Sequence, residues 1–124
     1  MSISLEADGH RLSVNVWNWG VLHHFVAKAG VFPDERWDPF RFSGGGALER
    51  PEVVALGAFL RRELLPRLRE GERIFYDGSV TDVPDDGTFY RDEAEMWRNY
   101  SLQREVLVSV IELLEAAPGA VEIG

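Results

Sequence analysis

The chain has 124 residues, of which 45% are hydrophobic, 27% are charged and none is cysteine. This length and composition are typical of one soluble globular domain, so we treat 1–124 as a single domain. The lack of cysteine excludes disulfides, thiolate metal sites and cysteine nucleophiles. The net charge of −8 repels phosphate groups, which argues against nucleic acids and anionic membranes as partners.

The hydrophobicity pattern of the chain also bears on its cellular location. No apolar run approaches the ~20 residues of a membrane helix, and residues 1–6 lack the basic start and apolar core of a signal peptide. We therefore expect a cytoplasmic protein, and no cofactor is indicated by any motif.

Residues 2–17 predict a β-hairpin. Apolar and polar residues alternate on both sides of Asp8-Gly9, and this dipeptide favours a type I′ turn because both central positions need positive φ. A two-residue loop sets the register and gathers the aliphatic side chains on one face. The expected pairs are Ala7 with His10, Leu5 with Leu12 and Ile3 with Val14.

A first helix is predicted over 19–29, with Asn18 as its N-cap and Gly30 as a left-handed stop. Its apolar stripe is Leu22, Phe25, Val26 and Ala29. A loop with two prolines follows, and we expect a short strand over 40–42.

A second helix is predicted over 51–65, because Pro51 suits a first turn and Pro66 ends or kinks a helix. Its buried stripe is Val53, Leu56, Leu60 and Leu64. Residues 73–77 then predict a strand, 92–116 a third helical region, and 120–123 a terminal strand. This order predicts an α+β fold, in which a mixed or antiparallel sheet carries about three helices on one face.

The acidic stretch 77–95 is the strongest feature of the charge pattern, with seven acids and one base, Arg91. One interpretation is a solvated surface that keeps the protein soluble. The other is a docking surface for a basic protein, in which the carboxylates pair with cations and Trp97 anchors the interface. The expected carboxylates are Asp82, Asp85, Asp86, Glu93 and Glu95.

An alternative hypothesis is a metal-dependent or small-molecule enzyme that uses His23 and His24 with Asp34 and Asp38. Adjacent helical histidines point about a hundred degrees apart and lack the i, i+4 spacing of helical zinc ligands, so proximity is the only support. Two partly exposed histidines on a helix surface are the simpler expectation. No catalytic motif such as G-x-S-x-G occurs, and the enzyme hypothesis therefore has no positive signal.

Packing and turn motifs spread along much of the chain resemble those of small bacterial single-domain proteins, some of them discussed as immunity or antitoxin-like partners. The motifs lie at 14–19, 29–32, 42–46, 51–60 and 119–123. The resemblance implies a soluble bacterial protein and assigns no site. Our leading hypothesis is therefore a non-enzymatic, immunity- or antitoxin-like domain that binds a basic partner. A third hypothesis is a subunit that forms a homodimer through a sheet edge or an apolar helix face.

Overall fold

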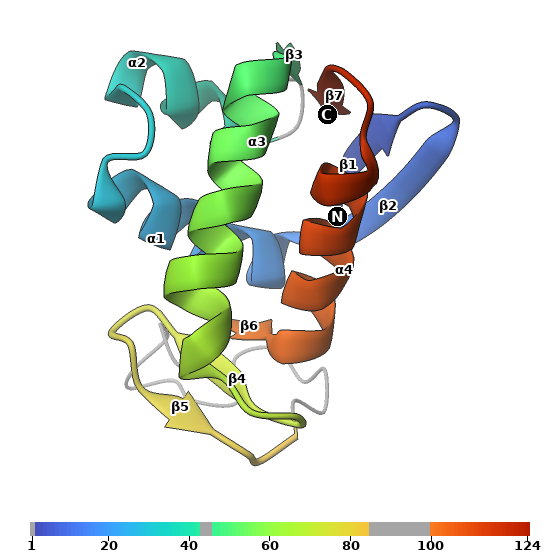
Figure 1. Cartoon of the computed structure of the whole chain (residues 1–124). Coiled ribbons are helices and arrows are strands. Elements are labelled where there is room, and N and C mark those ends of the chain that lie inside the picture. Colours follow the sequence, from blue (N-terminus) through green and yellow to red (C-terminus); the bar gives the residue numbers. More distant parts are fainter. Residues whose placement is uncertain (1, 43–45, 85–99) are drawn as a thin grey trace.

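A computed structural model describes residues 2–42, 46–84 and 100–124 of the chain (Figure 1). The described elements form an α+β fold, as expected. The α-helices are α1 (Val16–Ala29), α2 (Asp34–Trp37), α3 (Arg50–Phe59) and α4 (Arg104–Ala116). The strands are β1 (Ser2–Ala7), β2 (His10–Asn15), β3 (Gly46–Leu48), β4 (Arg73–Phe75), β5 (Val80–Thr81), β6 (Ser101–Gln103) and β7 (Val121–Ile123).

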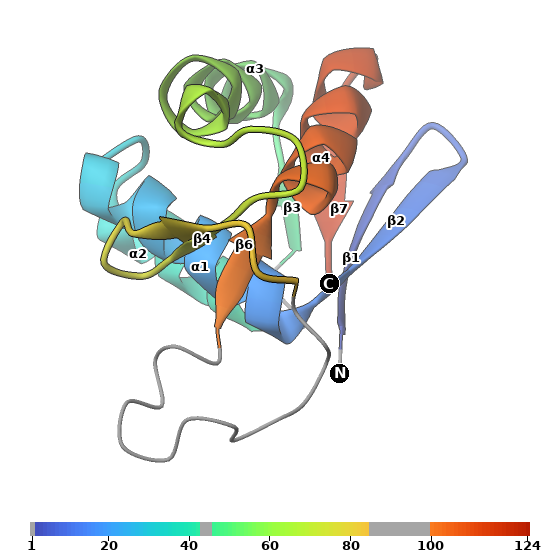
Figure 2. The ribbon, with the colours of Figure 1, turned by 90° about the horizontal axis from the view of Figure 1, so that it is seen from below.

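The strands form two antiparallel sheets rather than the single sheet that we expected. Sheet A has the order β2-β1-β7-β3, and sheet B has the order β5-β4-β6. Helices α3 and α4 pack side by side, and α1 lies behind them in Figure 1, an arrangement that Figure 2 shows from below. In Figure 1, sheet B lies at the lower ends of α3 and α4. No helix in the described ranges is both long enough and apolar enough to span a bilayer.

The N-terminal hairpin is confirmed, with the predicted register along its whole length. Asp8 and Gly9 have φ angles of 50° and 78°, the left-handed values that a type I′ turn needs. The aliphatic side chains of β1 are buried, and the hairpin thus gives one face to the core.

Helix α1 begins one turn earlier than predicted, because Asn15 rather than Asn18 caps it. The Asn15 side-chain oxygen accepts a hydrogen bond from the Asn18 N–H at 2.8 Å. Asn18 is buried instead, and its own side-chain oxygen accepts from the Gln103 N–H at 2.8 Å, across to β6. At the other end Gly30 is the left-handed stop that we expected, with φ 68°.

Three further boundaries differ from prediction. Residues 38–41 form a 3₁₀ turn with Pro39 in its first turn, and this turn replaces the strand expected over 40–42. The second helix changes to a π-turn over 60–64 and a 3₁₀ turn over 65–67, because Pro66 has no N–H to continue the hydrogen-bond ladder. Residues 101–103 are a strand that pairs with β4, so α4 begins at Arg104, whereas the expected helical residues 92–99 lie outside the described ranges.

One cluster of buried hydrophobic side chains packs between the helices and the two sheets. The stripe predicted for the second helix is fully buried, and the largest enclosed side chains are Trp19, Trp37 and Phe40. Of the stripe predicted for the first helix, Leu22, Phe25 and Val26 are buried and Ala29 is exposed. Trp19 donates its indole N–H to the Phe40 carbonyl at 2.8 Å, which satisfies a polar group that burial would otherwise leave unpaired.

Helix α1 also lies very close to the segment after β4. A Cβ added at Gly20 would lie 2.8 Å from the hydroxyl oxygen of Tyr76. The aromatic ring of Tyr76 contacts the rings of His24 and Tyr100, so moving its hydroxyl away would disturb both ring contacts. Glycine at position 20 is therefore what lets α1 approach sheet B.

We predict that Gly20→Ala lowers the free energy of unfolding by about 1–3 kcal/mol, the usual cost of overpacking. Adding Tyr76→Phe removes the clashing oxygen and is expected to recover most of that loss. Gly57→Ala is the matched control, because its new Cβ would meet Leu114 at an ordinary 3.6 Å and alanine favours the helix. Urea denaturation of the wild type and the three variants measures these values, and equal effects of the two glycine substitutions would contradict the prediction.

Candidate functional site

The structure places only part of the predicted acidic surface. Asp82 is exposed just after β5. The other five predicted partner-binding residues lie outside the described residues, and they are Asp85, Asp86, Glu93, Glu95 and Trp97. The structural account of this site therefore rests on the described residues next to the gap, which end at 84 and resume at 100.

One buried arginine, Arg73, binds Val83 inside the acidic stretch and Ser101 after it. Arg73 begins β4 and is 5% exposed. Its Nε donates to the Val83 carbonyl at 2.8 Å, and its Nη1 donates to the Ser101 hydroxyl at 3.0 Å. The guanidinium also lies over the ring of Phe75, 4.9 Å from its centroid. Val83 and Ser101, which lie near the two ends of the gap in the described residues, thus contact the same side chain.

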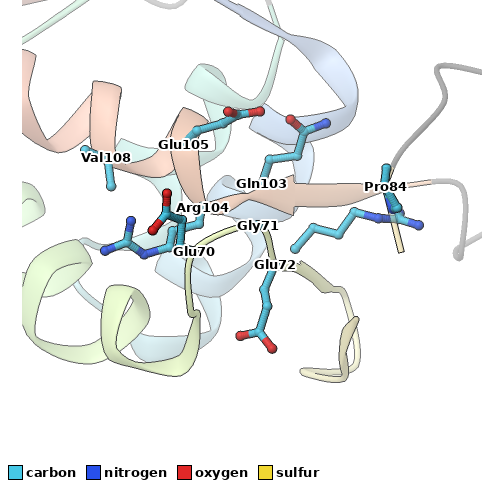
Figure 3. A pocket seen from close by; sticks show the side chains of 9 residues that line it. Glu70, Gly71, Glu72, Pro84, Gln103, Arg104, Glu105 and Val108 are labelled. Carbon is cyan, nitrogen blue, oxygen red and sulfur yellow. The ribbon is translucent and has the colours of Figure 1, made fainter. Parts of the chain in front are cut away.

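We call Arg73 with its partners Val83 and Ser101 the arginine clamp. A cavity of about 480 Å³ adjoins it, and Arg73 is one of the residues that line this cavity. Its walls come from the turn before β4, from Pro84 and from the start of α4, as Figure 3 shows. Gly71 has φ 82°, a left-handed value that lets the turn double back at the cavity wall. The turn is closed by the Glu72 N–H, which donates to the Arg69 carbonyl at 3.0 Å.

The cavity carries both signs of charge, with an excess of carboxylates. Glu70, Glu72 and Glu105 line it together with Arg73 and Arg104. In Figure 3 the side chains of Glu70 and Arg104 lie on the side of Val108, away from Pro84. Free carboxylate oxygens here accept hydrogen bonds from an ammonium or guanidinium group.

Arg104 has one unsatisfied donor. Its backbone N–H donates to the Glu72 carbonyl at 3.0 Å, which joins α4 to the cavity wall. Its side-chain Nε is buried and has no hydrogen-bond partner within the described residues. An unpaired buried donor costs about 1–3 kcal/mol.

The predicted histidine site has a different arrangement. His23 is buried at 3% exposure, and its Nε2 lies 2.9 Å from the Trp37 carbonyl oxygen, while the Trp37 indole N–H donates to the His23 carbonyl at 3.0 Å. The two rings stack with centroids 4.6 Å apart. His23 is therefore a core residue, which corrects the expectation of a partly exposed side chain.

The remaining residues of that hypothesis do not complete a metal site. His24 is half-buried with its ring edge-on to Tyr76, and Asp34 and Asp38 are exposed on α2 and the turn after it. Within residues 2–42, 46–84 and 100–124, no three histidine or acidic side chains are placed to hold a metal ion. Burial lowers the pKa of both histidines.

Sequence reasoning missed Arg73, Ser101 and Arg104. Arg73 is the first residue of an otherwise apolar strand. An arginine in that position indicates only weakly that its guanidinium is buried and hydrogen-bonded. Its partners Val83 and Ser101 are 10 and 28 positions away, and the pairing of β4 with β5 and with β6 brings them to Arg73. The pairing of strands that lie far apart in the chain cannot be predicted from the local sequence pattern.

The burial of His23 predicts a pH effect on stability. The unfolded chain takes up a proton near the ordinary histidine pKa of 6.5, whereas the folded chain takes it up only at lower pH. The unfolded state therefore binds more protons in this window, and stability falls as pH drops from about 7 to about 5.

We expect His23→Gln, whose amide can still donate to Trp37, to flatten this dependence, with His24 accounting for the slope that remains. The exposed His10→Gln serves as the control and is expected to keep the wild-type slope. Urea midpoints measured every half pH unit test this. An unchanged slope in His23→Gln would show that burial of His23 does not cause the effect.

Comparison with known proteins identifies no relative. No protein-family model, no curated protein and no solved structure matches this chain. The resemblance to immunity and antitoxin-like proteins therefore stays a prediction, and the function is argued from the geometry of the site.

Proposed function

We propose that this protein is a non-enzymatic interaction domain, immunity- or antitoxin-like in kind, that binds a basic protein in the bacterial cytoplasm. The observation that carries the proposal is the arginine clamp. Because Arg73 binds both Val83 and Ser101, the two ends of the segment that holds most of the acidic stretch start from one point. Glu70, Glu72 and Glu105 line the cavity that Arg73 and Pro84 also line.

Charge supports a basic partner. The chain carries a net −8, and residues 77–95 contribute seven acids against one base. A concentrated negative surface accelerates the encounter with a basic protein by ~10–1000-fold at low salt, and the effect fades as salt rises. In this proposal Asp82 and the acids of 85–95 steer the partner, and Trp97 anchors it.

The cavity supports a basic side chain as ligand. An arginine or lysine side chain of the partner pairs with the carboxylates of Glu70 and Glu105, which no described side chain neutralises through a close ion pair.

The first test uses a fluorescent nine-residue arginine peptide as the probe. The test variant neutralises four acids of the stretch through Asp85→Asn, Asp86→Asn, Glu93→Gln and Glu95→Gln. The control neutralises four distant acids and changes net charge equally, through Asp34→Asn, Asp38→Asn, Glu35→Gln and Glu122→Gln. We expect the test variant to bind at least ten times more weakly by anisotropy at low salt, and the control to change affinity less than threefold. Equal losses in both would mean that net charge alone binds the peptide and would overturn the proposal.

The cavity is tested by the pair Glu70→Gln and Glu105→Gln, with Glu35→Gln and Glu122→Gln as the matched control. We expect a three- to tenfold weaker affinity for the cavity pair only. The difference between the pairs is expected to shrink at high salt, because screening weakens exposed charges. If the two pairs behave alike, the cavity has no part in binding and only the acidic stretch remains as the docking surface.

A further inference from the structure

Strand β2 is the outer strand of sheet A. In Figures 1 and 2 it lies at the outside of the molecule, with β1 on its inner side. All six of its residues pair with β1 without a bulge, and it contains no proline. It therefore has none of the bulges or prolines that commonly protect edge strands, and Arg11 is its only lysine, arginine or acidic residue.

The turn geometry determines which backbone groups face outward. A two-residue turn closes on a hydrogen-bonded pair, here Ala7 with His10, and such pairs then alternate along the ladder. Leu12 and Val14 consequently direct their N–H and C=O groups toward β1. Arg11 and Ser13 direct theirs outward, where the described residues offer them no backbone partner.

We propose that this edge binds β2 of a second copy of the chain, antiparallel and about a two-fold axis through Leu12. Arg11 of each copy then lies opposite Ser13 of the other, and the outward N–H and C=O groups form four hydrogen bonds between the copies. The four-stranded sheet A becomes one continuous sheet of eight strands.

Charge and capping select this register. A pairing centred on Arg11 would place two arginines directly opposite each other, which is unfavourable. A pairing centred on Ser13 would place Arg11 opposite Asn15, whose side chain is already engaged in capping α1. The register centred on Leu12 has neither conflict.

The apolar face supports the same arrangement. Leu5 is fully buried opposite Leu12, which is only half-buried. A groove of about 340 Å³ separates the hairpin from α4, and Leu12, Leu113 and Ala116 lie along it. In the proposed dimer, Leu12 of each copy meets Leu12 of the other at the mouth of this groove, and the two Leu5 side chains complete a row of four leucines.

The small area of the proposed interface sets the affinity that we expect for the dimer. Pairing of two six-residue edges buries less than the ~1,200 Å² of a standard stable interface. We therefore expect a dissociation constant in the tens to hundreds of micromolar, measured by sedimentation velocity from about 5 µM to about 1 mM. A wild-type chain that stays monomeric at about 1 mM would overturn the proposal.

The test variant is Ser13→Pro. Proline removes the outward N–H of position 13 but no hydrogen bond to β1, and edge strands tolerate it where the N–H faces solvent. We expect at least tenfold weaker dimerisation. Ser13→Thr keeps the N–H and is the matched control, expected to dimerise like the wild type. Wild-type association of Ser13→Pro would overturn the proposal.

Leu12→Lys is the second variant, used if circular dichroism shows that Ser13→Pro is unfolded. It places two like charges on the two-fold axis, so we expect it to be monomeric over the whole concentration range. Dimerisation of Leu12→Lys at the wild-type level would equally overturn the proposal. Arginine-peptide binding does not enter this test, and the outcome is independent of the proposed function.

Discussion

The burial of α1 is the constraint on which the rest of the structure depends. This helix carries Asn18, Trp19 and His23 into the core, and each of these polar side chains needs a partner once water is excluded. The partners are backbone groups of Gln103, Phe40 and Trp37. These three hydrogen bonds therefore fix how the segments around Gln103, Phe40 and Trp37 pack against α1.

This constraint reaches the proposed site through β6. Asn18 holds the backbone of Gln103, which is the last residue of β6 and precedes α4. The same three-residue strand presents Ser101 to Arg73 and is followed by Arg104 at the cavity. The core of the protein and one end of the proposed docking surface thus share one short strand, so a change in the packing of α1 is expected to alter the positions of Ser101 and Arg104.

Local chemistry explains what could be predicted. The hairpin register follows from a turn that needs positive φ, and the stop at Gly30 and the stripe of α3 follow from backbone freedom and helical spacing. The prediction failed where a distant partner decides the outcome. Leu102 fits a helical stripe but is paired with Ile74 in a strand, and Asn18 resembles a cap but serves β6. Of the candidate site, the acidic composition was visible in the sequence, whereas the clamp by Arg73 depends on strand pairing and was not.

The place of β7 in sheet A has a consequence for the order of folding. Ser4 and Gly124 exchange two backbone hydrogen bonds although 120 positions separate them, and β3 joins the sheet only through β7. A hairpin such as β1–β2 forms within ~1–10 µs, whereas closing a sheet between distant segments is much slower. We therefore expect the β1–β2 hairpin to form before β7 adds to its inner edge. In that interval both edges of the hairpin are unpaired, and after β7 has added, the outer edge of β2 is the one left for another strand.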